Sequence, residues 1–415
     1  MSQPVNKHSN DVTMKNEYQP LPVADRLVDV GEYYFSGKLR EIEEMNRVVN
    51  DVINLGIGSP DLPPQGEVII KLRDEAMKPN THAYQSYKGS PVLRKAFADW
   101  YKKWYDVSLD PDQEILPLIG SKEGIMHICM TYVNPGDPVL IPNPGYPTYQ
   151  SAAKIAGAKI AAYSLTAENN WYPNFKALEE TLQKLKDEVK DWKGCLMFVN
   201  YPHMPTGQLP SRDLFTELVA FAKRHNLLLV NDNPYSFILN DTPMSLLGVE
   251  GAKDVVIELN SLSKSHNMAG WRIGVAVAAR RRIEEIMRFK SNMDSGMFLP
   301  LQLAAARALE SGPDWFDELN KTYGKRRETV YDLLKMLKCN FDTKQAGMFV
   351  WASIPAEFEN SYTFSDSILQ SSNVFLTPGG IFGSEGDKYI RVSLCTQEAR
   401  IREAIDRISM MKNKL

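Results

Sequence analysis

The sequence predicts an α/β fold: a large domain with a mostly parallel sheet flanked by helices, and a smaller α+β domain. Three features indicate this. Short apolar runs recur from about Asp51, amphipathic stretches separate them, and the pattern changes after about Ser291. Continuous apolar runs are typical of strands buried on both faces, as in a parallel sheet covered by helices. Regular alternation of such strands with helices favours an open α/β sheet.

Six apolar runs are the candidate strands of the large domain, and none of them alternates polar with apolar residues. They are residues 115–119, 139–141, 195–199, 227–230, 255–259 and 273–278. The stretches between them have helical features. Residues 175–189 repeat apolar side chains at helical spacing, and Ser211 can cap a helix that runs through residues 214–226.

The last third of the chain has a different pattern. A long helical segment covers residues 314–337, two strand candidates follow near 348–354 and 389–394, and a final helix runs towards the C-terminus. We therefore expect three parts: an N-terminal arm over residues 1–50, which joins the smaller domain, a large domain over 51–295 and a small C-terminal domain over 296–415.

Composition excludes several classes of protein. The chain has 415 residues, 43% hydrophobic and 24% charged, which is ordinary globular composition. A net charge of −3 gives no basic surface for nucleic acid or anionic membranes. No apolar run approaches the ~18 residues of a membrane span, and the N-terminus lacks the apolar region of a signal peptide. The four cysteines lie far apart without a CxxC pair, so we expect free thiols, mostly in the core, in a cytoplasmic protein without a metal site.

The residues that follow the apolar runs are the candidate site. In open α/β sheets, ligands bind beyond the carboxyl ends of the strands, so these residues should meet at one edge of the sheet. They are Gly120, Ser121 and Lys122 after the first run, Asn200 after the third, Asp232 after the fourth, and Lys264 after the fifth.

Each of these residues has a structural interpretation beside the functional one. A Gly-Ser pair before a helix is commonly only a cap, but its backbone N–H groups also suit a phosphate. Asp232 can be a turn residue, yet an unpaired charge directly after a buried strand is costly, and a pyridinium N–H would pair it. Most lysines are solvated, whereas Lys264 stands among small polar residues. Partial desolvation there would lower its pKa and make it a nucleophile towards carbonyls.

At these residues the sequence resembles the fold type I pyridoxal-phosphate enzymes, specifically the class I/II aminotransferases, from about Asn54 to the C-terminus. The family's S-x-S-K segment, with an arginine eight positions after the lysine, reads here as Ser261, Ser263, Lys264 and Arg272. The resemblance implies that Lys264 carries pyridoxal 5'-phosphate as a Schiff base. It also implies that the serines and Arg272 hold the phosphate, together with the turn formed by Gly120, Ser121 and Lys122.

The resemblance assigns further residues by position. The family's D-x-x-Y reads Asp232 to Tyr235, with Asp232 on the pyridine nitrogen and Tyr235 on the phenolic oxygen. Lys264, Asp232 and Tyr235 are then the catalytic residues, and Asn200 belongs to the cofactor set. The remaining positions are Tyr146, stacked on the ring; Tyr84, which reaches the phosphate of the neighbouring subunit; Arg391, which binds the substrate carboxylate; and the backbone at Ile57 and Gly58 near that carboxylate. A homodimer with shared sites is implied.

One position departs from the family's pattern. The family usually has N-N-P-T-G, whose second Asn contacts the phenolic oxygen and the substrate carboxylate, and this chain has Met204 there. Met204 cannot supply an amide, so the contact is missing or is replaced by His203 or Asn200. For His203 the alternative is an ordinary loop histidine.

The implied activity is transfer of an amino group from an L-amino acid to a 2-oxo acid by ping-pong kinetics, with Lys264 as the general base. Two alternatives remain. A β C–S lyase would use the same lysine and aspartate. A regulatory pyridoxal-phosphate-binding protein would need a DNA-binding module, and the segment before Asn54 is too short and irregular for a helix-turn-helix of the usual design. The substrate is open: residues 291–300 offer no arginine for a second carboxylate, and GSKEGI resembles the branch with alanine and diaminopimelate aminotransferases.

Overall fold

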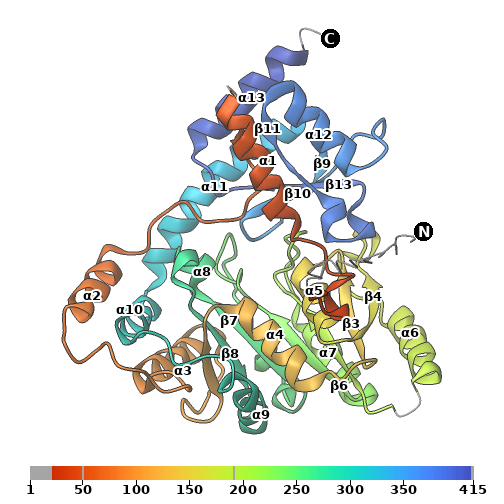
Figure 1. Ribbon diagram of the computed structural model, residues 1–415. Helices are drawn as coiled ribbons and strands as arrows, with labels where there is room; N and C mark the ends of the chain where they lie inside the picture. Colours follow the sequence, from red (N-terminus) through yellow and green to blue (C-terminus); the bar gives the residue numbers. More distant parts are fainter. Residues whose placement is uncertain (1–20, 49–50, 190–191, 413–415) are drawn as a thin grey trace, which may run out of the picture.

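The computed structural model describes residues 21–48, 51–189 and 192–412. Its larger part is built on a seven-stranded sheet in the order β2-β8-β7-β6-β5-β3-β4, seen in the lower half of Figure 1. The strands are β2 (Ile115–Leu118), β3 (Pro138–Asn143), β4 (Lys159–Ser164), β5 (Cys195–Val199), β6 (Leu227–Asp232), β7 (Val256–Ser261) and β8 (Gly274–Ala278). The pairs from β7 to β4 are parallel, whereas β8 runs antiparallel to both of its neighbours.

Helices cover both faces of this sheet, which is why its strands are apolar throughout. Along β6, Leu229 packs into the core cluster on one face, while Leu228 and Val230 pack into the cluster on the other. The first face is covered by α3 (Pro91–Tyr105), α6 (Phe175–Glu188), α7 (Arg212–His225) and α10 (Leu299–Leu309). The second face is covered by α4 (Ser121–Tyr132), α5 (Pro147–Ile155) and α9 (Arg280–Lys290).

The C-terminal elements form a second core above the large sheet in Figure 1. A four-stranded antiparallel sheet has the order β12-β13-β10-β9, and β1 pairs in parallel with β11. The strands are β1 (Ile53–Asn54), β9 (Asn340–Phe341), β10 (Phe349–Ser353), β11 (Val374–Phe375), β12 (Thr377–Pro378) and β13 (Tyr389–Ser393). The helices are α11 (Pro313–Met336), α12 (Ser361–Ser372) and α13 (Glu398–Lys412).

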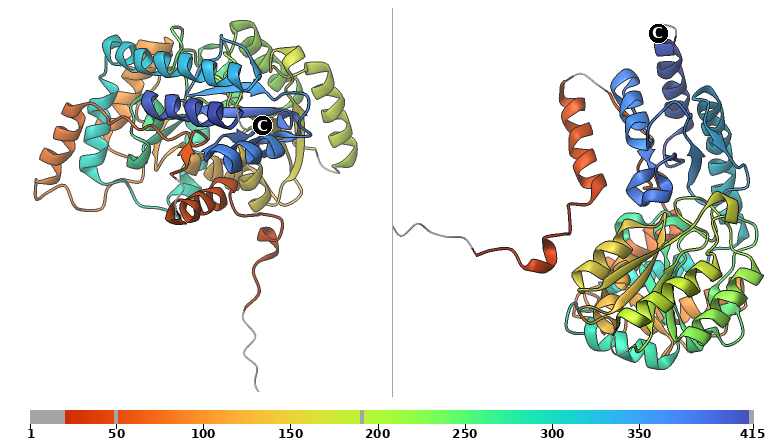
Figure 2. Two further views of the ribbon diagram at one scale, coloured as in Figure 1. Left: turned by 90° about the horizontal axis from the view of Figure 1, so that it is seen from above. Right: turned by 90° about the vertical axis from the view of Figure 1, so that its right-hand side faces the viewer.

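The N-terminal arm packs on this second core. Its helix α1 (Tyr34–Val48) stands beside the C-terminal helices in Figure 2. Ile42 of α1 packs against Leu369 and Phe375, and Phe35 belongs to the core cluster of the C-terminal elements. The chain then passes through β1 to α2 (Gly66–Ala76), which packs on α10.

The predicted fold class is confirmed, and the six predicted strands are all present as β2, β3 and β5 to β8. Ser211 caps α7 as expected, because its hydroxyl accepts a hydrogen bond of 3.0 Å from the Leu214 N–H. The edge strand β4 was not predicted. Its residues are mostly exposed or half-buried, so it lacks the continuous apolar run by which the inner strands were found.

The division into an arm, a large domain and a small domain is a proposal, and the packing supports a later second boundary than residue 295. Residues of α10 and Phe316, near the start of α11, belong to the core of the large sheet. Leu319 and the buried residues after it in α11 belong to the core of the C-terminal elements. We therefore propose that the boundary lies between Phe316 and Leu319, within the single helix that serves both cores.

Two further expectations concern the whole chain. All four cysteines are buried, and Cys129, Cys195 and Cys395 are free thiols, as the sequence predicted. Within the described ranges no helix combines the length and the apolar character that crossing a membrane requires.

Candidate active site

The sequence-predicted residues meet at a cavity of about 580 Å³ between the large sheet and the C-terminal elements. All of them line it except Gly120 and Tyr84; those that do are Ile57, Gly58, Ser121, Lys122, Tyr146, Asn200, Asp232, Tyr235, Ser261, Ser263, Lys264, Arg272 and Arg391. The carboxyl ends of β6 and β7 bring Asp232 and Lys264 to the same edge of the sheet, as parallel strands require.

Lys264 lies in the short helix α8 (Leu262–Ser265), directly after β7. Ser261 starts this helix, because its hydroxyl accepts a hydrogen bond of 3.1 Å from the Ser263 N–H. The Lys264 ammonium donates to the Gly58 carbonyl oxygen at 2.6 Å. Removal from water lowers the pKa of Lys264, and the positive charges of Arg391 and Arg272 lower it further. The amine is therefore easier to deprotonate than an exposed lysine, which a nucleophile requires.

Asp232, at the end of β6, is a buried carboxylate with one free oxygen. Its Oδ2 accepts a hydrogen bond of 2.9 Å from the Tyr149 hydroxyl, whereas Oδ1 has no partner among the described residues. Burial raises the pKa of Asp232 to about 6. A positively charged N–H at this point would satisfy Oδ1 and stabilise the ionised carboxylate. The site therefore fits a protonated pyridine nitrogen.

The anion-binding part of the cavity is the N-terminus of α4 with Arg272 beside it. Gly120 precedes this helix with φ +81°, and a Cβ there would lie 2.1 Å from Arg272 Nη2. Only glycine lets the guanidinium approach the turn so closely. The Arg272 guanidinium also lies 3.4 Å from the Ser263 hydroxyl, which accepts from Nη1. Free helix N–H groups, a guanidinium and a hydroxyl together suit a phosphate.

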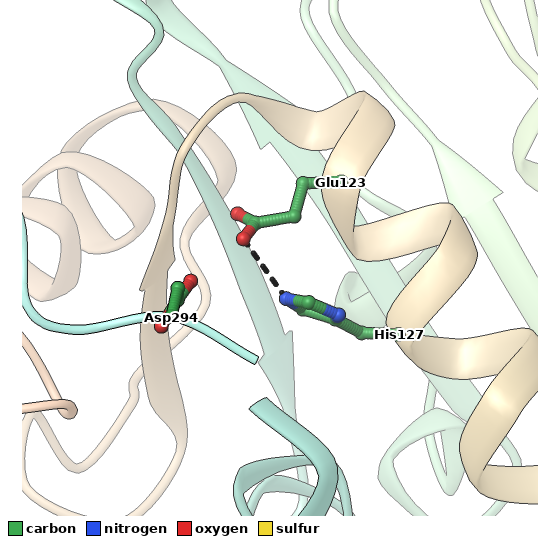
Figure 3. A group of neighbouring side chains, drawn as sticks. All are labelled: Glu123, His127 and Asp294. Atoms are coloured by element: carbon green, nitrogen blue, oxygen red, sulfur yellow. Dashed lines mark ion pairs between the residues drawn. The ribbon is translucent and has the colours of Figure 1, made fainter. Parts of the chain in front are cut away.

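A group of charged side chains lies behind this turn (Figure 3). Glu123 of α4 accepts a hydrogen bond of 2.6 Å from the Ile119 N–H, directly before Gly120, and pairs with His127 at 3.0 Å. Burial would raise the pKa of Glu123, but the hydrogen bonds from His127 and Ile119 hold it at about 2.

The side chains of Glu123, His127 and Asp294 have the donor types of a metal site, with ligand atoms within 4.8 Å of one another. The Lys290 ammonium, however, already pairs with Asp294 at 2.5 Å and supplies a positive charge there. We therefore interpret the group as an ion-pair network that fixes the anion-binding turn.

Arg391 of β13 is a buried guanidinium with no carboxylate partner in the described part of the chain. Its Nη2 donates to the Gly56 carbonyl at 2.9 Å, and Nη1 points at the Met204 sulfur at 3.3 Å. The Phe349 ring centroid lies 3.8 Å from the guanidinium carbon. Burial lowers the pKa of Arg391 to about 10. A substrate carboxylate would supply the missing negative charge.

The family has an asparagine where this chain has Met204, and the structure tests whether His203 or Asn200 supplies that amide contact instead. His203 is buried outside the cavity lining, with Nδ1 2.8 Å from the Thr206 hydroxyl, and burial lowers its pKa to about 3. Asn200 does line the cavity, but its side chain is used locally. Its Nδ2 donates to the Asp232 carbonyl and its Oδ1 accepts from the Met204 N–H. The described contacts thus show no amide in place of the family's Asn, and Met204 presents its thioether to Arg391.

Some residues of the cavity were not predicted from the sequence. Tyr149 binds Asp232, and its position three residues after Tyr146 in α5 is the signal that could have found it, since that spacing places both on one helix face. Tyr33 and Phe35 of the N-terminal arm also line the cavity, and no local motif marks them. Tyr84 has a side chain that is 93% exposed. Its role towards a neighbouring subunit stays a prediction.

Comparisons with known proteins point to one family of enzymes. The family model described as "Aminotransferase class I and II" matches residues 50–408. The chain is 39% identical over 387 residues to an LL-diaminopimelate aminotransferase of Halothermothrix orenii, covering 93% of this chain and 97% of that protein. The apo structure of BacF from Bacillus subtilis has 35% identity and a TM-score of 0.89, covering 95% and 99% of the two chains. A probable N-succinyldiaminopimelate aminotransferase from Thermus thermophilus has 29% identity and a TM-score of 0.83, with 91% and 99% covered.

We predict that Asp232 destabilises the protein when no ligand is bound, and that it does so only above acid pH. Burial raises its folded pKa from 3.8 to about 6, so the folded state binds more protons than the unfolded state in that window. Stability of the ligand-free protein should therefore fall as pH rises from about 4 to about 6. Asp232→Asn should remove this loss and stabilise the ligand-free protein by up to roughly 3 kcal/mol above pH 6.

The measurement is the urea midpoint at pH 4, 5, 6 and 7 for ligand-free wild type and variant. Asp241→Asn, at an exposed position, is the matched control. A gain for Asp232→Asn that is the same at pH 4 and pH 7 would contradict the electrostatic explanation.

Proposed function

This chain belongs to the class I and II aminotransferases, a family of pyridoxal-phosphate-dependent enzymes, and from this premise we propose how its own residues perform the reaction. In the proposal, Lys264 holds the cofactor as a Schiff base, and an amino group moves from an L-amino acid to a 2-oxo acid in two half-reactions with ping-pong kinetics. One observation carries it: the Lys264 amine, the free Asp232 oxygen and the unpaired Arg391 guanidinium line a single cavity.

Each residue has a defined task in this proposal. Pyridoxal phosphate, when bound, supplies the electron sink for the carbanion. Asp232 holds a proton at the pyridine nitrogen, and Tyr149 orients that carboxylate through its hydroxyl. Arg272 and the N-terminal amides of α4 hold the phosphate. Arg391 binds the substrate carboxylate, which turns the α-hydrogen towards Lys264. The Lys264 amine then moves the proton at the α-carbon, and its lowered pKa suits a general base.

The remaining expectations become proposals here. We propose that Tyr146 stacks on the cofactor ring and that Tyr235 reaches its phenolic oxygen, and both residues line the cavity. A cytoplasmic location is supported by the buried, free thiols of Cys129, Cys195 and Cys395. The lyase and the regulatory protein are not favoured by any contact in the cavity, and the curated relatives with 37–39% identity are named aminotransferases.

We predict that borohydride fixes the cofactor to Lys264. The purified enzyme should be yellow, reduction should attach the cofactor to the peptide that contains Lys264, and mass spectrometry of the digest measures the attachment. Lys264→Ala should lose the attachment and slow turnover at least about 100-fold, because general acid–base catalysis contributes that much. Lys122→Ala, the other lysine of the cavity, is the control and should keep the attachment. A Lys264→Ala protein with wild-type turnover would refute the assignment.

We predict that Arg391→Lys weakens the use of amino acid far more than the binding of cofactor. A guanidinium binds a carboxylate through two parallel hydrogen bonds, which an ammonium cannot copy. The loss of about 1.5–3 kcal/mol should lower kcat/KM for the amino acid about 10- to 100-fold. Arg272→Lys is the matched variant, and it should weaken retention of the cofactor instead. An unchanged kcat/KM in Arg391→Lys would show that the substrate carboxylate binds elsewhere.

We predict a homodimer whose sites are shared through Tyr84. Subunits carrying Tyr84→Phe and subunits carrying Lys264→Ala should each have low activity. Mixed dimers contain one site with both native residues, so mixing should restore part of the activity. Lys264→Ala mixed with Asp232→Ala is the control, because both residues line the cavity of the same chain. A fully active monomer in dilute sedimentation runs would exclude this arrangement.

A further inference from the structure

The part of the cavity left for the substrate's side chain can be located from the proposed roles. Arg391 fixes the carboxylate and Lys264 lies next to the α-carbon, so the side chain must extend along the remaining walls. These walls come from the N-terminal arm and from the residues around the guanidinium, and they include Tyr33, Phe35, Leu39, Ile57, Met204 and Phe382. The space is therefore bounded mainly by aromatic and apolar groups.

Phenyl rings surround the point where the carboxylate would bind. The Arg391 guanidinium carbon lies 4.7 Å from the Phe382 ring centroid and 5.4 Å from the Phe35 ring centroid. Phe35 is 8% exposed and Met204 is 5% exposed, so both surfaces are already removed from water. An apolar substrate side chain that contacts them loses its own hydration without leaving a polar group unpaired, which favours binding.

The charges of the cavity disfavour a second positive group on the substrate. Asp232 is the only carboxylate among the described lining residues, and its two oxygens are taken by Tyr149 and by the proposed pyridine N–H. Lys122 also lines the cavity, with its ammonium 4.7 Å from the Tyr33 ring centroid. A distal ammonium would be buried near this like charge without a carboxylate to bind it.

We propose that the amino donor of this enzyme has an aromatic or long apolar side chain and carries no second ammonium group. The inference rests on the proposed aminotransferase function. It separates this chain from relatives named LL-diaminopimelate aminotransferases, whose named substrate has two amino groups. Phe35 and Met204 are the residues that determine this specificity.

The test is the first half-reaction of the holoenzyme, followed by the absorbance of the bound cofactor with donor alone. L-norleucine and L-lysine have the same carbon skeleton, and L-lysine carries an additional terminal ammonium. We expect kcat/KM to be at least about tenfold higher for L-norleucine, and L-phenylalanine to exceed L-alanine by about 10- to 100-fold, as burial of a large apolar side chain allows. Equal or better use of L-lysine or LL-diaminopimelate would overturn the proposal.

Two variants of the N-terminal arm test whether Phe35 contacts the side chain of the amino donor. Phe35→Ala should lower kcat/KM for L-phenylalanine about tenfold or more while changing that for L-alanine much less. Ile42→Ala is the control, because Ile42 is buried in the same helix but packs against Leu369 and Phe375 and does not line the cavity. Equal losses for both donors in Phe35→Ala, or for both variants with L-phenylalanine, would overturn the role of Phe35.

The same assay distinguishes an error in the substrate class from an error in the proposed function. If LL-diaminopimelate gives the highest kcat/KM in the first half-reaction, the aminotransferase function stands and only the proposed substrate class is wrong. If no amino acid in the panel, L-alanine and L-glutamate included, changes the cofactor's absorbance, the aminotransferase mechanism itself is refuted.

Discussion

The constraint on which this structure depends is the burial of ionisable groups that the described chain does not fully pair. Asp232 has a free oxygen, Arg391 has no carboxylate and Lys264 has only a carbonyl partner. Each would cost free energy in an ordinary core, and burial shifts the pKa of all three towards the neutral form. In the proposed function, a cofactor with a cationic nitrogen and a substrate carboxylate would supply the opposite charges. These two ligands would then pair charges that the folded chain itself leaves without partners.

Asp232 and Lys264 lie at the ends of packed strands, where the surrounding core holds their positions. β6 and β7 are adjacent parallel strands buried on both faces, so their carboxyl ends cannot move independently. The anion-binding turn is held from behind by Glu123, which binds the Ile119 N–H and pairs with His127. Gly120 then admits Arg272 against the turn. These contacts fix the strand ends and the turn, and they leave Asp232 Oδ1 without a partner among the described residues.

The sequence could predict the large sheet and the residues at its edge because both follow from local pattern. Continuous apolar runs mark the inner strands, and Asp232 and Lys264 follow such runs within five residues. The edge strand β4, which is largely exposed, had no such run. Tyr149 was not predicted as a site residue, because its role depends on one hydrogen bond to Asp232, which is distant in the sequence. Phe35 was not predicted for a similar reason. It reaches the cavity only because the arm packs on the C-terminal core, and no local sequence pattern indicates that contact.

Met204 departs from the family pattern, and its contacts show what this difference changes around Arg391. An amide oxygen at this position would be a strong acceptor for Arg391 Nη1, whereas the thioether sulfur that lies there is a weak one. The guanidinium therefore gives up little when Nη1 turns to a substrate carboxylate. The same sulfur adds a polarisable apolar surface to a wall that already contains Phe35 and Phe382. In the proposed function, Arg391 would then bind the substrate carboxylate without help from an amide at position 204, and the neighbouring space is more apolar. Met204 therefore leaves Arg391 Nη1 with a weak partner and adds apolar surface to the phenyl rings around the guanidinium.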